Sequence, residues 1–383
     1  MTAPFVHRTL ASRVVFGPGC IAGLAGELSA LGLRRPLVLS GPRTAASALH
    51  AVVRAALGGL PCIWFSEVPA HSSVEVVDHL VTLARHEGVD GFIAVGGGSA
   101  SDTAKATAMW LAEGGRLEDH ASRFTPPHTL FIPELRQPKL PIVAVPGTAS
   151  GAEVTPGLGV RTKDGHKLLF TDPQLAARLI LIDPQANLDV PAPLMLATGM
   201  NGLAHCLEGL YSKVRSPVST ALALHGTALF FRALPAVADA PQDMAARGDL
   251  LAAAHLSGQV LLNARTCLHH AVCHALGAST GIGHGDANAV LLPAAIAFNA
   301  GAAQTELKAA AAAIGVSQPQ GLVDALQALQ IKLGVPTRLR DLGVRRDQLP
   351  AVAAQVMHER GLYFNPRAVA HAGEIEVLLD SVW

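Results

Sequence analysis

The sequence predicts an α/β domain followed by an all-helical domain. Over residues 1–187, short β-branched apolar runs alternate with helical stretches, which is typical of a parallel sheet with helices on both faces. After residue 187 these runs vanish and alanine and leucine dominate. A chain of 383 residues also exceeds what one core usually holds. We therefore expect one domain over 1–187, a second over 188–383, and a boundary near Pro184–Pro193.

The N-terminal half contains six apolar runs that predict strands. They are Arg13–Phe16, Pro36–Ser40, Cys62–Phe65, Gly91–Val95, Ile142–Val145 and Leu179–Ile182. The segment Arg123–Lys139 carries four prolines, so we expect an irregular excursion there. In the C-terminal half, long helices are predicted over Leu188–Ala240, Met244–Ala278 and Ala287–Ala313.

Composition excludes several classes of function. The 29 Lys and Arg residues equal the 29 Asp and Glu residues, and this balance argues against a nucleic-acid binder. Half of the residues are hydrophobic, but no unbroken apolar run of membrane-spanning length is evident, so we expect a large soluble core and no membrane. Five cysteines without a CxxC pair and an N-terminus without an apolar signal core favour the cytoplasm.

The sharpest N-terminal motif is GFIAVGGGSASDTAKA at residues 91–106. A buried strand runs into Gly96, Gly97, Gly98 and Ser99, and a helix carrying Asp102 follows. Glycines without side chains let phosphate oxygens reach backbone N–H groups at a helix N-terminus, so the motif predicts a pyrophosphate site. A tight strand-to-helix turn without a ligand is the alternative, because the spacing is not that of GxGxxG.

Two further segments bear on the cofactor. Thr148 and Ser150 follow an apolar strand, and we expect their loop to form a second wall of one cofactor cleft. The strand that ends at Ser40 has no carboxylate to bind a ribose 2′-hydroxyl. NADPH is therefore not excluded, and Arg43 can pair with its phosphate unless it is a solvated loop residue.

The helical half carries the acid–base and metal candidates. Asn201 and His205 are one helical turn apart and share a face, as do His270 and His274. His284 follows in a glycine-rich loop. Histidines clustered on apolar helix faces favour a site over scattered solvated side chains.

These motifs, in this order, resemble the group III, iron-type alcohol dehydrogenases, which share the dehydroquinate synthase-like fold. The resemblance covers essentially the whole chain and includes GGGSASDTAK, PGTASGAEVT, TGMNGLAHCLEGLYS and HHAVCHALGASTGIGHGDANAVLLP. It implies a nucleotide-binding α/β domain, an all-helical domain, nicotinamide in the cleft between them, and a homodimer. Lys167 aligns with a lysine that contacts the cofactor in these dehydrogenases, although a surface lysine is the plain alternative.

The resemblance implies metal ligands at Asn201, His205, His270 and His284, where the family has an aspartate and three histidines. An amide is a neutral, poorer ligand for a hard cation, so we expect no metal. GMN in place of GMD is similar to the maleylacetate reductase branch of this family, and so is the doublet of His269 and His270 in HHxxCHxLG.

Membership of that branch implies reduction of the carbon–carbon double bond of maleylacetate, a dicarboxylic oxo-acid, to 3-oxoadipate by NADH or NADPH. His270 and His274, with His205 and His284 nearby, are then the candidate proton donors and carboxylate-binding groups.

Two alternatives remain open. Gly147 replaces the threonine usual in the branch, and HKLLFTDPQLAARLILIDP is closer to the metal-dependent dehydrogenases. A metal-dependent alcohol dehydrogenase or aldehyde reductase would bind its metal through His205, His270 and His284. A non-redox enzyme or binding protein on the same fold is the other alternative, and the intact glycine loop argues against it.

Overall fold

The computed structural model describes residues 4–126 and 129–383, and the chain separates into two compact units. The α/β unit comprises residues 9–123 and 130–191. The helical unit comprises residues 192–383, residues 4–8 and the described part of 124–129. The main segment of the helical unit thus begins within the expected boundary region of Pro184–Pro193, four residues after position 188, and the unit also includes two short segments from the first half of the chain.

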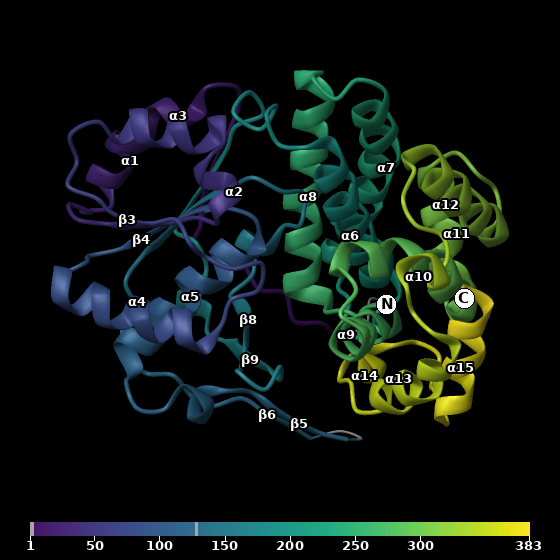
Figure 1. Cartoon of the computed structure of the whole chain (residues 1–383). Helices are drawn as coiled ribbons and strands as arrows, with labels where there is room; N and C mark the ends of the chain where they lie inside the picture. Colours follow the sequence, from purple (N-terminus) through teal and green to yellow (C-terminus); the bar gives the residue numbers. More distant parts are fainter. Residues whose placement is uncertain (1–3, 127–128) are drawn as a thin grey trace. The chain divides into compact units, whose positions relative to one another are not determined.

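The α/β unit is built on a six-stranded parallel sheet, and all six predicted strands are confirmed (Figure 1). Its order is β1–β10–β7–β4–β2–β3. The strands are β1 (Arg13–Phe16), β2 (Leu37–Leu39), β3 (Ile63–Phe65), β4 (Phe92–Gly96), β7 (Ile142–Pro146) and β10 (Leu179–Ile182). Because β4 and β7 are neighbours with Gly96 opposite Pro146, the loops that follow them start at the same edge of the sheet.

Helices cover this sheet, with their starts and ends set by local residues. They are α1 (Leu24–Ala30), α2 (Pro42–Ala45), α3 (Ala48–Leu57), α4 (Val74–Glu87) and α5 (Gly98–Glu113). The Oγ atom of Ser73 caps α4 by accepting from the backbone N–H of Val76 at 3.4 Å, and Gly88 ends the helix with a φ of 64°. Hydrophobic side chains from α1, α3 and the central strands form one core.

Two further two-stranded sheets are present, and the β8–β9 pair is antiparallel. One is formed by β8 (Gly157–Arg161) and β9 (Lys167–Thr171), and the other by β5 (Arg123–Thr125) and β6 (Thr129–Phe131). The prediction of an entirely irregular Arg123–Lys139 segment was therefore wrong at β5 and β6. Threonine and phenylalanine, which both strands contain, are residue types enriched in β-strands. Pro127 lies outside the described residues.

The helical unit contains shorter helices than the sequence predicts. They are α6 (Ala192–Tyr211), α7 (Pro217–Asp239), α8 (Met244–Ala264), α9 (Leu268–Thr280), α10 (His284–Asn299), α11 (Gln304–Ala313), α12 (Pro319–Leu333), α13 (Leu349–Val356), α14 (Gly361–Phe364) and α15 (Ala372–Ser381).

Each of the three predicted long helices is divided in two. Ser216 caps α7 in a capping box with Ser219, and Pro217 occupies the first turn, so the chain restarts a helix there. The second break follows the unusual backbone of Arg265, and the third lies between Asn299 and Gln304.

The helix α7 has the length and hydropathy of a membrane-spanning helix, contrary to the sequence reading that no such run is present. It packs against α6 and α8, and 44% of its apolar window is buried. A core helix has the same properties, so this helix is weak evidence for a membrane span.

Arg265 ends α8 in a conformation that normally requires glycine. Its φ is 64° and its ψ is 178°, and among the described residues it is the one non-glycine with a positive φ. Such backbone costs about 1–3 kcal/mol in a residue with a Cβ atom. We expect Arg265→Gly to raise the free energy of unfolding in urea by about 1 kcal/mol. Arg265→Ala keeps the Cβ atom and should give no gain, and an alanine variant as stable as the glycine variant would contradict the argument.

Candidate active site

The helical unit gathers four predicted histidines into one cluster. His205 lies on α6, His270 and His274 lie one turn apart on α9, and His284 begins α10. The rings of His205 and His270 stack at 4.7 Å between centroids, and those of His274 and His284 stack at 5.7 Å. His270 lies 6.0 Å from His284, so it connects the two pairs. His205 and His270 are buried, whereas His284 is exposed.

A buried hydrogen-bonded chain runs through His270. Its Nδ1 atom lies 2.5 Å from Oε2 of Glu208, and its Nε2 atom lies 3.1 Å from Oδ1 of Asn201. Both partners lie on α6, and Glu208 is fully buried. The Glu208 carboxylate fixes the orientation of the His270 imidazole, and the Asn201 amide oxygen is hydrogen-bonded to the second ring nitrogen.

Sequence reasoning missed Glu208. Its Oε1 atom accepts from the backbone N–H groups of Cys267 at 3.0 Å and His269 at 2.8 Å. Burial raises the pKa of Glu208 to about 7, and His269 and these N–H groups oppose that rise. The signal in the sequence is spacing, because Asn201, His205 and Glu208 stand at i, i+4 and i+7 on one helix face.

His269 lies beside the cluster, and both of its ring nitrogens contact other groups of the protein. Its Nε2 atom lies 3.0 Å from the carbonyl oxygen of Asn288, and its Nδ1 atom lies 3.4 Å from Nδ1 of His270. Burial lowers the pKa of His269 to about 4, followed by the effect of His270. A neutral ring that donates from Nε2 to this carbonyl has a structural role in joining α9 to α10.

The other imidazoles have distinct surroundings. Burial, and then the neighbouring imidazoles, lower the pKa of His205 well below its ordinary value. The Nδ1 atom of His205 is buried and has no hydrogen-bond partner among the described residues. The half-buried His274 has its Nδ1 atom 3.5 Å from a carboxylate oxygen of Glu359. The cluster therefore contains buried rings, whose lowered pKa values favour the neutral form, and the more exposed rings of His274 and His284.

The side chains present do not fit a hard divalent cation well. At the position of the expected carboxylate, Oδ1 of Asn201 is hydrogen-bonded to Nε2 of His270. These are the two atoms that would have to bind the metal, and each is already used by the other. Glu208, His269 and His270 place ligand atoms within 4.8 Å of one another, but this set shares only His270 with the expected one. Hydrogen bonds to backbone and neighbouring rings already account for these atoms.

In the α/β unit, the glycine motif forms a strand-to-helix turn. Gly96 ends β4 with a φ of 125°, and Gly98 begins the 16-residue helix α5. A Cβ atom on Gly97 would lie 3.0 Å from the Thr148 side chain, so the second loop lies directly against the glycine loop. The backbone N–H of Gly147 also donates to the carbonyl of Gly96 at 2.8 Å. The two predicted loops are thus neighbours, and the N–H groups at the start of α5 lie beside Thr148.

The hydroxyl groups near this turn already form hydrogen bonds within the protein. The side chains of Thr148 and Ser150 lie 3.3 Å apart, oxygen to oxygen. Ser99 donates its hydroxyl to the carbonyl of Ala70 at 2.5 Å. This bond joins the first turn of α5 to the loop that precedes α4.

Asp102 and Lys167 meet at the β8–β9 hairpin. Asp102 accepts from the backbone N–H of Gly159 at 3.2 Å, and a Cβ atom on that glycine would lie 2.3 Å from Cε of Lys167. Burial raises the pKa of Asp102, and the charges of Lys105 and Lys167 oppose the rise. The buried Lys105 donates to the carbonyls of Ala152 at 2.8 Å and Gly157 at 3.2 Å, which holds the hairpin on α5.

The two remaining cofactor candidates lie after β2. Ser40 is buried and its hydroxyl lies 3.5 Å from that of Ser66. Arg43 is exposed on α2, and the described part of the chain offers it no ion pair. Neither residue is brought into contact with the glycine loop by a hydrogen bond that the structure shows.

Comparisons with known proteins agree with this architecture. The family profile for iron-containing alcohol dehydrogenase matches residues 11–184, and the profile for the C-terminal part of the Fe-containing alcohol dehydrogenase family matches residues 195–383. Together they span both units.

Individual relatives in this family share about a third of their residues with this chain and carry the name maleylacetate reductase. A maleylacetate reductase of Rhizobium sp. strain MTP-10005 is 34% identical, and the match covers 96% of this chain and 94% of the relative. One from Sphingobium indicum is also 34% identical over 99% of this chain and 97% of the relative. The crystal structure of maleylacetate reductase from Agrobacterium tumefaciens superposes with a TM-score of 0.85 at 32% identity, and it covers 100% of this chain and 98% of that one.

Proposed function

Since the chain belongs to the iron-containing alcohol dehydrogenase family, we propose that this oxidoreductase reduces the carbon–carbon double bond of maleylacetate, giving 3-oxoadipate. The observation that carries the proposal is identity above 30% along nearly the whole chain to enzymes named maleylacetate reductase. A related unsaturated oxo-acid of the same chemistry falls under the same proposal.

The reaction adds a hydride and a proton across an alkene. NADH or NADPH, when bound, supplies the hydride to the alkene carbon β to the ketone. The electron pair of the double bond moves toward the ketone oxygen as an enolate, and the α carbon then takes a proton. The protein therefore has to stabilise an enolate and deliver one proton. The position of the nicotinamide relative to the histidines stays a prediction.

His270 is the residue best supported as the proton donor. The buried Glu208 carboxylate lies 2.5 Å from its Nδ1 atom, and this arrangement stabilises a protonated ring as the carboxylate of a catalytic triad does. Glu208 is a positioning residue in this scheme. In the resting enzyme the proton on Nε2 of His270 is donated in a hydrogen bond to the oxygen of Asn201. During the reaction the enolate takes this proton.

His274 and His284, the more exposed members of the cluster, supply donors for a substrate carboxylate. His205 stacks against His270 and fixes one face of its ring.

We also infer that catalysis needs no metal. The neutral amide of Asn201 supports this, because it pairs with His270 at the position where the family pattern has an aspartate. We further propose, from the family resemblance of the sequence alone, that the chain acts on a small-molecule substrate as a cytoplasmic homodimer.

A combined assay tests this function. We expect purified protein to contain well below one metal ion per chain, and to oxidise NADH or NADPH when maleylacetate is added, at a rate that EDTA does not change. Elemental analysis and absorbance at the nicotinamide band measure these quantities. Stoichiometric metal with EDTA-sensitive activity on alcohols or aldehydes would return the chain to the metal-dependent dehydrogenases. Nicotinamide oxidation that never couples to a substrate would favour the non-redox alternative.

A further inference from the structure

Lys105 is a buried lysine that the proposed reaction has not yet used. It lies on α5 with 0% of its surface exposed, so it offers no contact to a bound cofactor. Its Nζ atom donates to the carbonyl of Ala152 at 2.8 Å and to the carbonyl of Gly157 at 3.2 Å. One side chain therefore bonds α5 to two other segments of the α/β unit.

The three segments that meet at this ammonium group carry most of the predicted cofactor residues. These are Ser99 and Asp102 on α5, Thr148 and Ser150 in the second loop, and Lys167 in the β8–β9 hairpin. All of them belong to the α/β unit. The second loop also lies against the start of α5, because a Cβ atom on Gly98 would lie 3.4 Å from the Cβ atom of Ala152. Lys105 thus joins the parts from which a dinucleotide site would be assembled.

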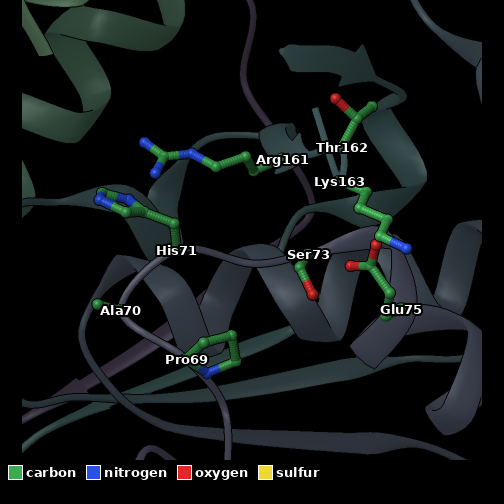
Figure 2. A pocket seen from close by; sticks show the side chains of 8 residues that line it. All are labelled: Pro69, Ala70, His71, Ser73, Glu75, Arg161, Thr162 and Lys163. Atoms are coloured by element: carbon green, nitrogen blue, oxygen red, sulfur yellow. The ribbon is translucent and has the colours of Figure 1, made fainter. Parts of the chain in front are cut away.

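The turn of the hairpin borders an open space. The backbone N–H of Arg161 donates to the carbonyl of Ser72 at 2.8 Å. Beside that bond, the turn and the loop before α4 line a pocket of about 590 Å³. Figure 2 shows this pocket, which Arg161, Thr162 and Lys163 of the hairpin line together with residues of the loop. Because open space adjoins the turn, the position of the hairpin depends more on the bonds that join it to α5.

The ammonium group of Lys105 belongs to a buried cluster of ionisable groups. Burial lowers the pKa of Lys105, and the carboxylates of Asp102 and Glu153 oppose that change. Glu153 is buried as well, and burial raises the pKa of its carboxyl to about 7. A buried cation is costly without partners, and its hydrogen bonds are stronger than those of a neutral donor. The two carbonyls are therefore held firmly.

We propose that Lys105 is a positioning residue for a nicotinamide dinucleotide. Its ammonium group fixes the second loop and the β8–β9 hairpin on α5, and so keeps the hydroxyls of the loop and Lys167 of the hairpin in place before the ligand arrives. The inference rests on the proposed function for the class of ligand. A preformed site avoids the loss of entropy from ordering two segments at binding, so the effect falls on affinity for the dinucleotide.

Two lysine variants separate this role from stability. Lys105→Met removes both hydrogen bonds and should raise the Kd for NADH about tenfold, measured by fluorescence titration without any substrate. Lys139→Met is the matched control. The Lys139 side chain is equally buried, and its Nζ atom lies 2.5 Å from Glu113 at the opposite end of α5 and 2.7 Å from Asp172. Both variants should lower the urea midpoint, but Lys139→Met should leave the Kd for NADH within about twofold.

A Glu153→Gln background protects the test against a variant that does not fold. It removes a buried carboxyl that loses its neighbouring cation when Lys105 is replaced. Glu153→Gln by itself should bind NADH as the unaltered protein does, and Lys105→Met in this background should again raise the Kd about tenfold. Lys105→Gln keeps an N–H donor, so it should fold and raise the Kd about threefold.

Amide hydrogen exchange locates the change within the α/β unit. In the free protein, Lys105→Met should speed exchange over residues 157–171, and saturating NADH should slow it again. An unchanged Kd in the Lys105 variants, equal rises in the Lys105 and Lys139 variants, or an unaltered protein that binds no NADH would overturn the proposal. A protein that binds NADH but does not reduce maleylacetate would refute the proposed function alone, because every measurement on Lys105 is made without turnover.

Discussion

Asn201→Asp is expected to create a metal site in the histidine cluster. The new carboxylate replaces a neutral oxygen that now pairs with His270, and the ring of His270 lies 4.7 Å from that of His205 and 6.0 Å from that of His284. A gain of a few kcal/mol in ion–ligand attraction corresponds to Zn²⁺ binding tighter by about a hundredfold. Reduction of maleylacetate should slow at least about tenfold, because the new carboxylate would hold the Nε2 proton of His270 more strongly than the amide does.

Competition with a metal-sensitive chelator measures this affinity in both proteins. Asn201→Ala is the first control, because it removes the amide without adding charge and should bind no more Zn²⁺ than the unaltered protein. His205→Ala in the Asn201→Asp background should abolish the gain. An unaltered protein that already holds one tightly bound metal ion per chain would show that the amide does not prevent metal binding.

The sequence was sufficient for the sheet but not for the lengths of the helices. Runs such as Phe92–Val95 are rich in β-branched and aromatic residues and end at glycine, so their type and limits are both local properties. In the helical half, alanine and leucine continue across the breaks, and the helices end where caps form. Ser216 caps α7 through its own hydroxyl, and Arg265 takes a backbone conformation that no propensity predicts.

In the candidate site, too, the local sequence predicts some features, whereas others depend on tertiary contacts. Spacing of four residues placed His270 and His274 on one face of α9 without any structure. The role of Glu208 depended on tertiary contacts, because a carboxylate in a helix is normally exposed and this one is buried against backbone N–H groups about 60 residues later. The meeting of Asp102 with Gly159 likewise requires the β8–β9 hairpin to fold back on α5.

Removing the imidazole of His270 should abolish most of the activity while the fold persists. We expect His270→Ala to lower kcat for maleylacetate by about 10² to 10⁴, the range for loss of a positioned general acid. KM for NADH should change little, because the glycine loop belongs to the other unit. Steady-state kinetics with each substrate varied measures both quantities, and circular dichroism checks that the variant is folded.

His269→Ala is the matched comparison, because the same residue type is lost one position earlier. The His269 ring donates to the carbonyl of Asn288 and is fully buried, so its loss leaves an unsatisfied acceptor and a cavity. The free energy of unfolding should fall by about 2–4 kcal/mol, and kcat should stay within about threefold. The two variants thus separate catalysis from stability within one helical turn. Equal losses of kcat in both would mean that the cluster acts as a packed unit and that His270 is not the specific proton donor.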